Sequence, residues 1–385
     1  MPPSRRRSNL IFILTCATIR AALTSQLCHS ATFEVPVDYP GIQLAIDAAS
    51  SGDSILVAPG TYIENLKTHG KYLSILSTSG PDLTIIDGNY AGTVIEIDGG
   101  GLIESFTITR GAAQCHGGGI NVLSTPDFHD PGPTTIRNNV ISNCATGFKC
   151  NGGGVSVAFL AHLVVLENNY IHNNAAGNEG GGIYADITFV PIEVIRNRVQ
   201  HNSAAWCGGG ASTAIANYSY NVFTNNSSGG PGGGICASSG SIIHNTIVSN
   251  TTTSFALVGA GIAARSTTIL SNIVTNNHRV GPSPGSGAGI SSDRAPQLAC
   301  NDSWGNDIDF HFLSAADTSG MHNFSADPQF CSPGEGDFRL SPGSPAAYPL
   351  GCGGPIGALP VELSCAPTAT RRTTWGTLKL LYRGK

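Results

Sequence analysis

The sequence predicts an all-β solenoid, and three observations lead to this fold class. Glycine clusters recur along the 385 residues at a nearly constant spacing, and asparagine-rich segments alternate with them. The apolar stretches between these motifs are short, β-branched and bounded by Gly or Asn, as strands are. Two motifs that alternate at a fixed period are typical of proteins whose units stack on their neighbours. We therefore expect stacked coils rather than a globular domain.

The glycine clusters set the period. Their third small residues are Gly119, Gly154, Gly182, Gly210, Gly234, Gly261 and Gly289. The steps between these glycines are 35, 28, 28, 24, 27 and 28 residues. Glycine passes a sharp corner without a Cβ clash, and the apolar residue after each cluster, such as Ile120 or Val155, is expected to point inward. Successive coils would stack about 4.8 Å apart in parallel register.

The asparagine segments begin at Asn138, Asn168, Asn197, Asn221, Asn245 and Asn272. Asparagine tolerates the left-handed backbone conformation that a tight corner requires. Asparagines at the same place in adjacent coils can also hydrogen-bond to one another in a ladder. These structural roles account for the repeated Asn and Gly without assigning them any chemistry.

Both ends of a solenoid expose a sheet edge that must be covered. Near the start, Ile42, Ala45, Ile46 and Ala49 have the spacing of a short amphipathic helix, which predicts an N-terminal helical cap within residues 36–60. Residues 295–360 are rich in Pro and lack the coil period, so we expect an irregular C-terminal cap there.

On these "GGGI" and "NxxxN" elements, the chain resembles secreted bacterial right-handed parallel β-helix repeat proteins of the pectin-lyase-like superfamily. The resemblance covers roughly residues 33–359 and implies a right-handed parallel β-helix solenoid. The opening order of helix, strand and "PGTYIE" is similar to that of many β-helix enzymes and non-enzymes, pectin methylesterases among them. It is therefore informative about the fold and says little about chemistry.

We divide the chain into a signal peptide (residues 1–31), the β-helix (32–360) and a basic C-terminal tail (361–385). Arg5, Arg6 and Arg7 precede an apolar run at residues 10–19 that is too short to span a bilayer, as in an export signal. A disordered basic start is the alternative. The tail is interpreted either as a sorting or anchoring signal or as a mobile end. The expected location is secreted or at the cell surface.

Composition limits the classes of partner. Charged residues make up 12% of the chain and its net charge is -5, which argues against nucleic acid. A hydrophobic fraction of 41% argues against disorder. Weak charge and many short polar side chains suit a neutral or mildly charged polymer, such as a polysaccharide or cell-surface glycan, or no ligand at all. We expect a monomer without a cofactor and with no transmembrane span in the mature chain.

Eleven cysteines fit an oxidising compartment, and the absence of any CxxC pair argues against a metal site. Cys115 and Cys150 each lie four residues before a repeat glycine. Stacking would bring their Cα atoms within disulfide range, so we predict a Cys115–Cys150 bond.

The remaining cysteines follow less regular positions. We expect a second bond between Cys331 and Cys352, which flank the cap loop. Cys207 and Cys236 sit at different offsets from their glycines and are expected to be unpaired neighbours. Nine cysteines remain from Cys115 onward, so at least one of them should be free.

The long first step predicts a loop over residues 124–135, which carries Asp127, His129 and Asp130, with His116 close in sequence. Extra residues in a solenoid leave as a loop on one face, and a carboxylate beside an imidazole can serve acid–base chemistry or bind a cation. The alternative is a solvated Pro-rich loop. A similar cluster, "DIDFHF", begins at Asp307.

Motifs of the familiar enzymes with this fold are absent from the sequence. The chain contains neither the Asp pair with Gly-His-Gly and Arg-x-Lys of polygalacturonases nor the Gln-Asp-Thr and Gly-Arg-Pro-Trp of pectin methylesterases. Between Gly152 and Asp293 the only acids are Glu167, Glu179, Asp186 and Glu193. So few carboxylates argue against calcium-dependent cleavage of uronates.

Two functional hypotheses follow. The first is an exported, non-catalytic protein with a glycan-binding, adhesive or structural role, in which Tyr184 and Trp206, together with Tyr170 and Tyr218, stack on sugar rings. The same aromatics could be ordinary outward or corner residues. The second is a carbohydrate-active enzyme, related to polysaccharide lyases, epimerases or glycosidases, that uses the 124–135 loop.

Overall fold

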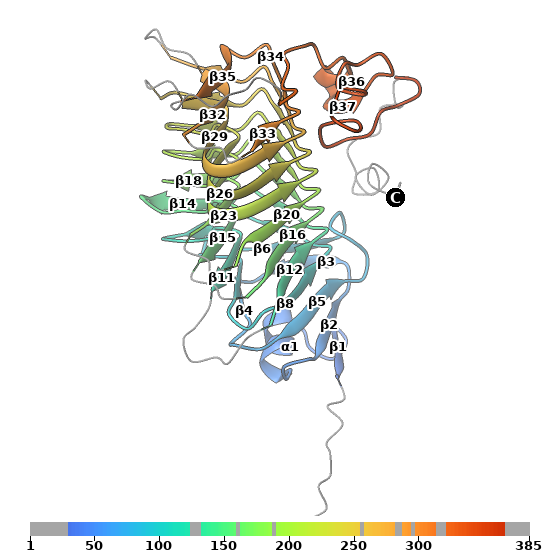
Figure 1. Cartoon of the computed structure of the whole chain (residues 1–385). Helices are drawn as coiled ribbons and strands as arrows, with labels where there is room; N and C mark the ends of the chain where they lie inside the picture. The colour runs from blue at the N-terminus through green and yellow to red at the C-terminus, as the bar shows by residue number, and fades with distance from the viewer. Residues whose placement is uncertain are drawn as a thin grey trace, which may run out of the picture.

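The computed structural model describes residues 30–123, 132–158, 162–186, 190–254, 258–281, 287–293, 297–312 and 321–365. It is a right-handed parallel β-helix in which three parallel sheets run along the solenoid (Figure 1). The expected signal segment up to residue 29, the loop residues 124–131 and the tail from residue 366 lie outside the described residues. The proposed domain boundaries therefore stay a prediction.

Sheet A is the largest, with 18 strands. They are β1 (Thr32–Val35), β2 (Ser54–Val57), β4 (Leu66–Lys67), β5 (Leu73–Ser77), β7 (Ile95–Ile97), β8 (Gly101–Glu104), β11 (Ile120–Leu123), β12 (Thr134–Arg137), β15 (Val155–Ala158), β16 (Val164–Glu167), β19 (Ile183–Ala185), β20 (Ile192–Ile195), β23 (Ala211–Ser219), β26 (Ile235–Ile243), β29 (Val258–Leu270), β32 (Gly287–Ser292), β33 (Leu298–Ala299) and β35 (Ile308–Phe312). Each coil contributes two short strands at first, and these merge into one long strand from β23 to β29.

Sheet B has ten strands: β3 (Gly60–Ile63), β6 (Thr84–Asp87), β9 (Thr107–Thr109), β13 (Val140–Ser142), β17 (Tyr170–His172), β21 (Arg198–Gln200), β24 (Val222–Thr224), β27 (Thr246–Val248), β30 (Ile273–Thr275) and β34 (Asp302–Trp304). Sheet C has seven: β10 (Ala112–Ala113), β14 (Ala145–Phe148), β18 (Ala175–Gly177), β22 (Ser203–Ala204), β25 (Ser227–Ser228), β28 (Thr251–Thr252) and β31 (His278–Arg279).

The residue after each glycine cluster forms a buried column, as the repeat predicts. Parallel pairing places Ile120 beside Val155, Val155 beside Ile183, and Ile235 beside Ile262. Every member of the column has an exposed fraction of 0%: Ile120, Val155, Ile183, Ala211, Ile235, Ile262 and Ile290. Burying an aliphatic side chain of this size stabilises the fold by about 1.5–3 kcal/mol, so the column is a main source of stability.

In each pair of adjacent asparagines, the first residue makes a left-handed corner and the second forms hydrogen bonds to neighbouring coils. In "NNYIHNN", Asn168 and Asn173 have φ values of 55° and make the left-handed corners. The residues that follow, Asn169 and Asn174, are buried, and their side-chain amides donate to the equivalent asparagines one coil later, at 3.0 Å in both cases. Leaving such a buried amide unpaired would cost about 1–3 kcal/mol, so each ladder fixes the stacking register.

The first coils are covered by one helix, and the predicted amphipathic pattern is confirmed. Helix α1 (Ile42–Ala48) buries Ile42, Ala45 and Ile46 against the start of the solenoid. The carboxylate of Glu64 accepts hydrogen bonds from the backbone N–H groups of Ile42 and Gln43, at 3.0 and 2.8 Å. These bonds satisfy donors that the first turn of a helix leaves unpaired.

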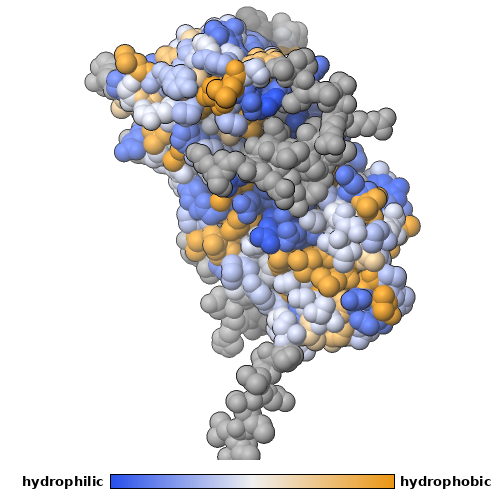
Figure 2. Space-filling view, turned by 90° about the vertical axis from the view of Figure 1, so that its right-hand side faces the viewer, coloured by the Kyte–Doolittle hydropathy of each residue, from blue (hydrophilic) through white to orange (hydrophobic). Residues whose placement is uncertain are grey.

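The irregular C-terminal cap begins later than expected, because β33, β34 and β35, within residues 298–312, still belong to the parallel sheets of the solenoid. The irregular part, which we call the C-terminal segment (described residues 321–365), folds back along sheet B (Figure 1). It contains the antiparallel pair β36 (Phe330–Ser332) and β37 (Asp337–Leu340), joined by the 3-10 turn η1 (Pro333–Glu335). Phe338 packs on Val222 and Val248 of the solenoid. Figure 2 views the molecule from this side, where hydrophobic and hydrophilic residues are mixed.

Four disulfides join eight of the nine cysteines from Cys115 onward, and the ninth, Cys144, is buried and free. The expected Cys115–Cys150 bond is present, with Cα atoms 4.8 Å apart. Burial raises the pKa of the Cys144 thiol to about 12, so this cysteine is chemically inert at neutral pH.

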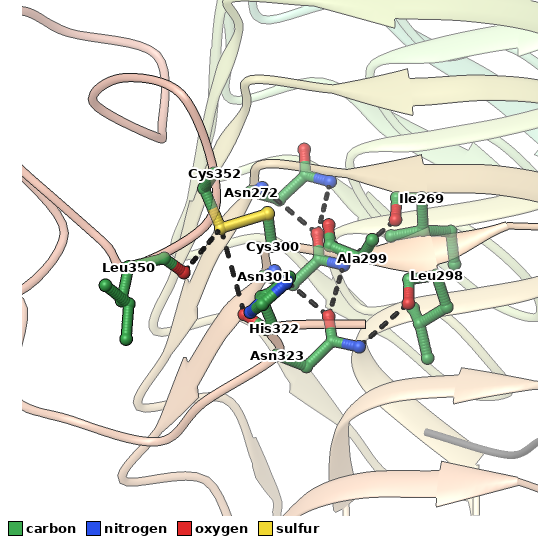
Figure 3. Close-up of a disulfide and its surroundings, with 10 residues drawn as sticks. All are labelled: Ile269, Asn272, Leu298, Ala299, Cys300, Asn301, His322, Asn323, Leu350 and Cys352. Carbon is green, nitrogen blue, oxygen red and sulfur yellow. Dashed lines mark hydrogen bonds between the residues drawn. A yellow bond between two sulfur atoms is a disulfide. The ribbon is translucent and has the colours of Figure 1, made fainter. Parts of the chain in front are cut away.

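Two cysteine predictions were wrong. Cys331 bonds to Cys365 and Cys352 to Cys300, so Cys331 and Cys352 are not partners. The chain of the C-terminal segment returns to the last coil, and Figure 3 shows Cys352 beside Cys300 at the end of the asparagine ladder Asn272–Asn301–Asn323. Because the C-terminal segment has no sequence repeat, its disulfide partners cannot be predicted by counting positions within a period.

Cys207 and Cys236 form the other unexpected disulfide, with Cα atoms 6.1 Å apart. The glycine corner explains this bond. At Gly232, where φ is 69°, a Cβ would lie 2.8 Å from the Cβ of Cys236, because the corner folds back over the strand that follows it. A cysteine in one corner can therefore reach an outward residue of the next coil, although their offsets from the repeat glycine differ.

Candidate functional site

A groove of about 520 Å³ runs across the outer face of sheet A. It extends over six stacked strands, from β19 through β23, β26, β29 and β32 to β35. At a coil spacing of about 4.8 Å this is a length of about 24 Å. Its volume lies within the usual range of ligand sites, about 300–1,000 Å³.

Two outward rows form the floor, because side chains alternate between the two faces of a strand. The first row contains Tyr184, Ser212, Cys236, Ala263, Ser291 and His311, which successive register pairs place side by side. The second row lies two residues further along each strand and contains Asp186, Ala214, Ser238, Arg265 and Asp293. The floor is thus a strip of hydroxyl, carboxylate and basic groups.

Tyr184 is the hydrogen-bonding centre at one end of the groove. Only 7% of its surface is exposed, and its hydroxyl bonds with Asp186 and Asn151. Burial raises the pKa of Tyr184 well above 10, and the neighbouring Asp186 and Glu179 raise it further. The phenol therefore stays protonated and acts as a hydrogen-bond donor rather than as a base.

Glu179 and Trp206 come from the glycine corners that form one wall of the groove. The hydroxyl of Ser212 donates to Glu179 Oε2 at 3.0 Å, and this bond links wall to floor. Trp206 is 56% exposed and its indole lies over Gly230, where a Cβ would approach ring atoms to 3.1 Å. The next residue, Cys207, is bonded to Cys236 of the floor, and the disulfide fixes the wall in place.

Arg265 supplies a cation near the far end of the groove. Its Nε lies 3.6 Å from Asp293 Oδ2, and the arginine side chain is 76% exposed. A pair this open to solvent contributes little to stability, about 0–1 kcal/mol. Arg265 is consequently available to a ligand. His311, one coil beyond Ser291, has a buried Nδ1 without a hydrogen-bond partner in the described part of the chain.

The structure separates the predicted site residues into three groups. Tyr184 and Trp206 both line the groove, although Tyr184 is too buried to serve as an open stacking platform. His116 lies in an earlier corner, two coils before Glu179, and does not line it. Asp127, His129 and Asp130 lie outside the described residues.

Two other predicted features also change. Tyr218 is fully buried and donates to Thr213 Oγ1 at 3.0 Å, so it offers nothing to a ligand. In the "DIDFHF" cluster Asp307 turns away to hydrogen-bond with His278 and with the backbone of Gly287. Only His311 of that cluster reaches the groove.

Sequence reasoning missed Ser212, Arg265 and Asp293 as groove residues. The signal was nonetheless present, since Asp186, Arg265 and Asp293 each lie four residues after a repeat glycine. Counting a fixed offset through all the repeats would have placed them in one row. In the described part of the chain, no group of three or more His, Cys, Asp or Glu is arranged to hold a metal ion.

The fold and the groove define a parallel β-helix protein with an elongated polar site across its coils. No protein-family model and no curated protein matches the chain. Among solved structures, "Pectin methylesterase from Carrot" is similar at 13% identity, with 78% of this chain and 88% of that chain covered and a TM-score of 0.34. A similarity this low carries no argument about function.

Proposed function

We propose that the protein is exported and binds a polysaccharide in the sheet A groove without cleaving it, in an adhesive or structural role. The observation that carries this proposal is the groove's combination of an exposed indole with a long row of hydrogen-bonding groups. Sugar rings offer apolar faces that pack on aromatic side chains, and their hydroxyls bond to carboxylates, hydroxyls and amides. A length of about 24 Å suits several units of an extended polymer.

The carboxylates of the groove support binding rather than catalysis. Glu179 accepts from Ser212, Asp186 bonds with Tyr184, and Asp293 faces Arg265. A carboxylate held in this way positions hydrogen bonds, whereas a general acid or base must be within reach of the reacting proton. The motifs of the familiar β-helix enzymes are also absent from the sequence.

Export rests on the N-terminal pattern of the sequence and on four disulfides, which persist in oxidising compartments. In the described residues no helix is long and apolar enough to cross a membrane. The alternative function, a carbohydrate-active enzyme that uses the 124–135 loop, stays a prediction, because it requires Asp127, His129 or His116 to meet an arginine or a second acid.

The test is to incubate the purified protein with uronate-containing and neutral polysaccharides, and to measure both binding and new reducing or unsaturated ends. We expect binding without new ends. Trp206→Ala should weaken binding by about 2- to 12-fold, the equivalent of 0.5–1.5 kcal/mol for an aromatic contact. Tyr348→Ala, which removes a 77% exposed aromatic outside the groove, should have no effect. New chain ends would support the enzyme instead. Equal binding by the wild type, Trp206→Ala and Tyr348→Ala would show that the polysaccharide does not bind in the sheet A groove.

A further inference from the structure

A second hollow, of about 640 Å³, lies between the C-terminal segment and sheet B, and we call it the sheet B cleft. Its floor is one outward row of the solenoid: Thr224, Val248, Thr275 and Trp304, which pair in register across β24, β27, β30 and β34. Phe330, Phe338 and Gln329 of the C-terminal segment form the opposite wall. The cleft shares no lining residue with the sheet A groove.

Two hydroxyl groups in this floor are buried without a partner. Thr224 and Thr275 are 2% and 1% exposed, and neither Oγ1 has a hydrogen bond within the described chain. Thr246, on the strand between them, provides a contrast, because its Oγ1 accepts a hydrogen bond from the backbone N–H of Ala358 at 2.9 Å. The segment thus satisfies the hydroxyl of Thr246 and leaves the hydroxyls of the two cleft threonines unpaired within the described chain.

An unpaired buried hydroxyl costs about 1–3 kcal/mol, and protein interiors seldom keep one without a reason. Two of them in one row, facing a hollow of ligand size, indicate a place where hydroxyl-bearing groups from outside complete the hydrogen bonds. The exposed side chains of Asn225 and Asn276, which follow the two threonines, extend the same polar row to the rim.

Charge and aromatic content narrow the class of ligand. The lining contains Asp327 and no Lys, Arg or His, so an anion would find no counter-charge. Trp304 is half-buried at the end of the threonine row, and the rings of Phe330 and Phe338 meet edge to face with centroids 5.3 Å apart. Aromatic rings beside hydroxyl and amide groups match a sugar, which has apolar faces and a polar edge.

The cleft is held in shape from both sides. The Cys300–Cys352 disulfide ties the C-terminal segment to the last coils (Figure 3), and Cys331–Cys365 closes the segment on itself next to Phe330. Phe338 packs on Val248 of the floor and on Val222 of the neighbouring strand. A wall anchored in this way lowers the entropy lost on binding.

We propose that the sheet B cleft is a second binding site, specific for one or two units of a neutral saccharide. The hydroxyls of Thr224 and Thr275 bond to sugar hydroxyls, and Trp304 packs on a ring face. The site is independent of the proposed function of the groove, because it is built from different residues and a different sheet.

Isothermal titration with four neutral trisaccharides (maltotriose, cellotriose, laminaritriose and mannotriose) tests the proposal. At least one should bind with a 1:1 stoichiometry, and trigalacturonate should not bind in the cleft. Thr275→Val removes the hydroxyl at nearly constant shape, so it should weaken binding by about three- to tenfold while leaving Tm unchanged or raised. A threonine with a structural role alone would give a lower Tm on substitution and an unchanged affinity.

Two tryptophan variants separate the cleft from the groove. Trp304→Ala should abolish or strongly weaken trisaccharide binding, Trp304→Phe should restore part of it, and Trp206→Ala should leave it intact. The proposal is overturned if none of the four sugars binds, if Thr275→Val binds as the wild type does, or if binding depends on Trp206 rather than on Trp304.

Discussion

The two hollows of this molecule are built in different ways. The sheet A groove is lined by residues of the stacked coils alone, and each of its six strands adds one residue to the first row. The sheet B cleft forms only where the non-repetitive C-terminal segment lies against the solenoid. The shape of the groove therefore depends only on the register between stacked coils. The shape of the cleft depends in addition on how the C-terminal segment packs on sheet B.

The outward side chains of sheet B differ between the strands that the C-terminal segment covers and the strands before them. On β17 and β21, at the margin of the segment, they are Tyr170, His172, Arg198 and Gln200, and the guanidinium of Arg198 reaches the segment at Gly336. On β24, β27 and β30, under the segment, they are Val222, Thr224, Thr246, Val248, Ile273 and Thr275. The same strand position changes from long polar side chains to short apolar or hydroxyl side chains once a second layer covers it, as burial requires.

Phe338→Ala should have the largest effect, because it removes a buried ring from the interface between segment and solenoid. We expect a loss of about 3–5 kcal/mol of docking stability. Hydrogen exchange should rise across residues 328–361 and stay low in the coils, with the cleft lost and the groove retained. Phe148→Ala, at a ring that is 84% exposed, is the matched control. Equal unfolding of the coils would show that segment and solenoid are one cooperative unit.

Asp302 should make the stability of this region depend on pH. It is buried under the C-terminal segment, and burial raises its pKa to about 7, with Asp309 and Asp327 adding to the rise. The folded state thus holds a proton that the unfolded state, with a carboxyl pKa of about 3.9, releases. Stability contributed by this group is present below about pH 4 and is lost as the pH rises to about 7.

Denaturant unfolding at pH 4.5, 5.5 and 7.5 measures this dependence. Wild-type stability should fall between the first and last values, and Asp302→Asn should flatten the slope. An amide at this position keeps an oxygen for the backbone N–H of Ala326, which donates to Asp302 Oδ1 at 3.0 Å. If the stability of the wild type and of Asp302→Asn changes equally with pH, the pH dependence arises from groups other than Asp302.

Arg265→Ala should have the smallest effect on stability and a visible one on binding. The arginine is 76% exposed and its pair with Asp293 is open to solvent, so unfolding should change by less than about 1 kcal/mol. Affinity for an anionic polysaccharide should fall, and the loss should shrink at high salt because exposed charges are screened. If Arg265→Ala binds the anionic polysaccharide at low salt as tightly as the wild type does, Arg265 does not contact the ligand.

The repeat made the solenoid predictable from the sequence. The inward column, the corner asparagines and the Cys115–Cys150 bond all follow from counting positions within one period. The same counting could have found Arg265 and Asp293, which share the offset of Asp186 from a repeat glycine. Trp206 and Tyr184 were recognised only as aromatics, since sequence alone did not tell the open ring from the buried one.

Contacts between residues at non-equivalent positions of the repeat, or outside the repeat, were not predictable from the sequence. The Cys207–Cys236 bond depends on how far a glycine corner folds over the next strand, which is a matter of three-dimensional geometry. The pairing of Cys331 and Cys352 with other partners depends on the path of a segment that has no repeat at all. The sheet B cleft belongs to the same class, because half of its lining comes from that segment.

Hydrogen exchange with and without a bound polysaccharide tests the central claim, that the groove is the ligand site, most directly. Protection should appear in the peptides that carry Tyr184, Trp206 and Arg265, in three different coils of the solenoid, and should be lost in Trp206→Ala. Protection confined to other faces of the solenoid, or no protection by any polysaccharide that the protein retains, would contradict the account.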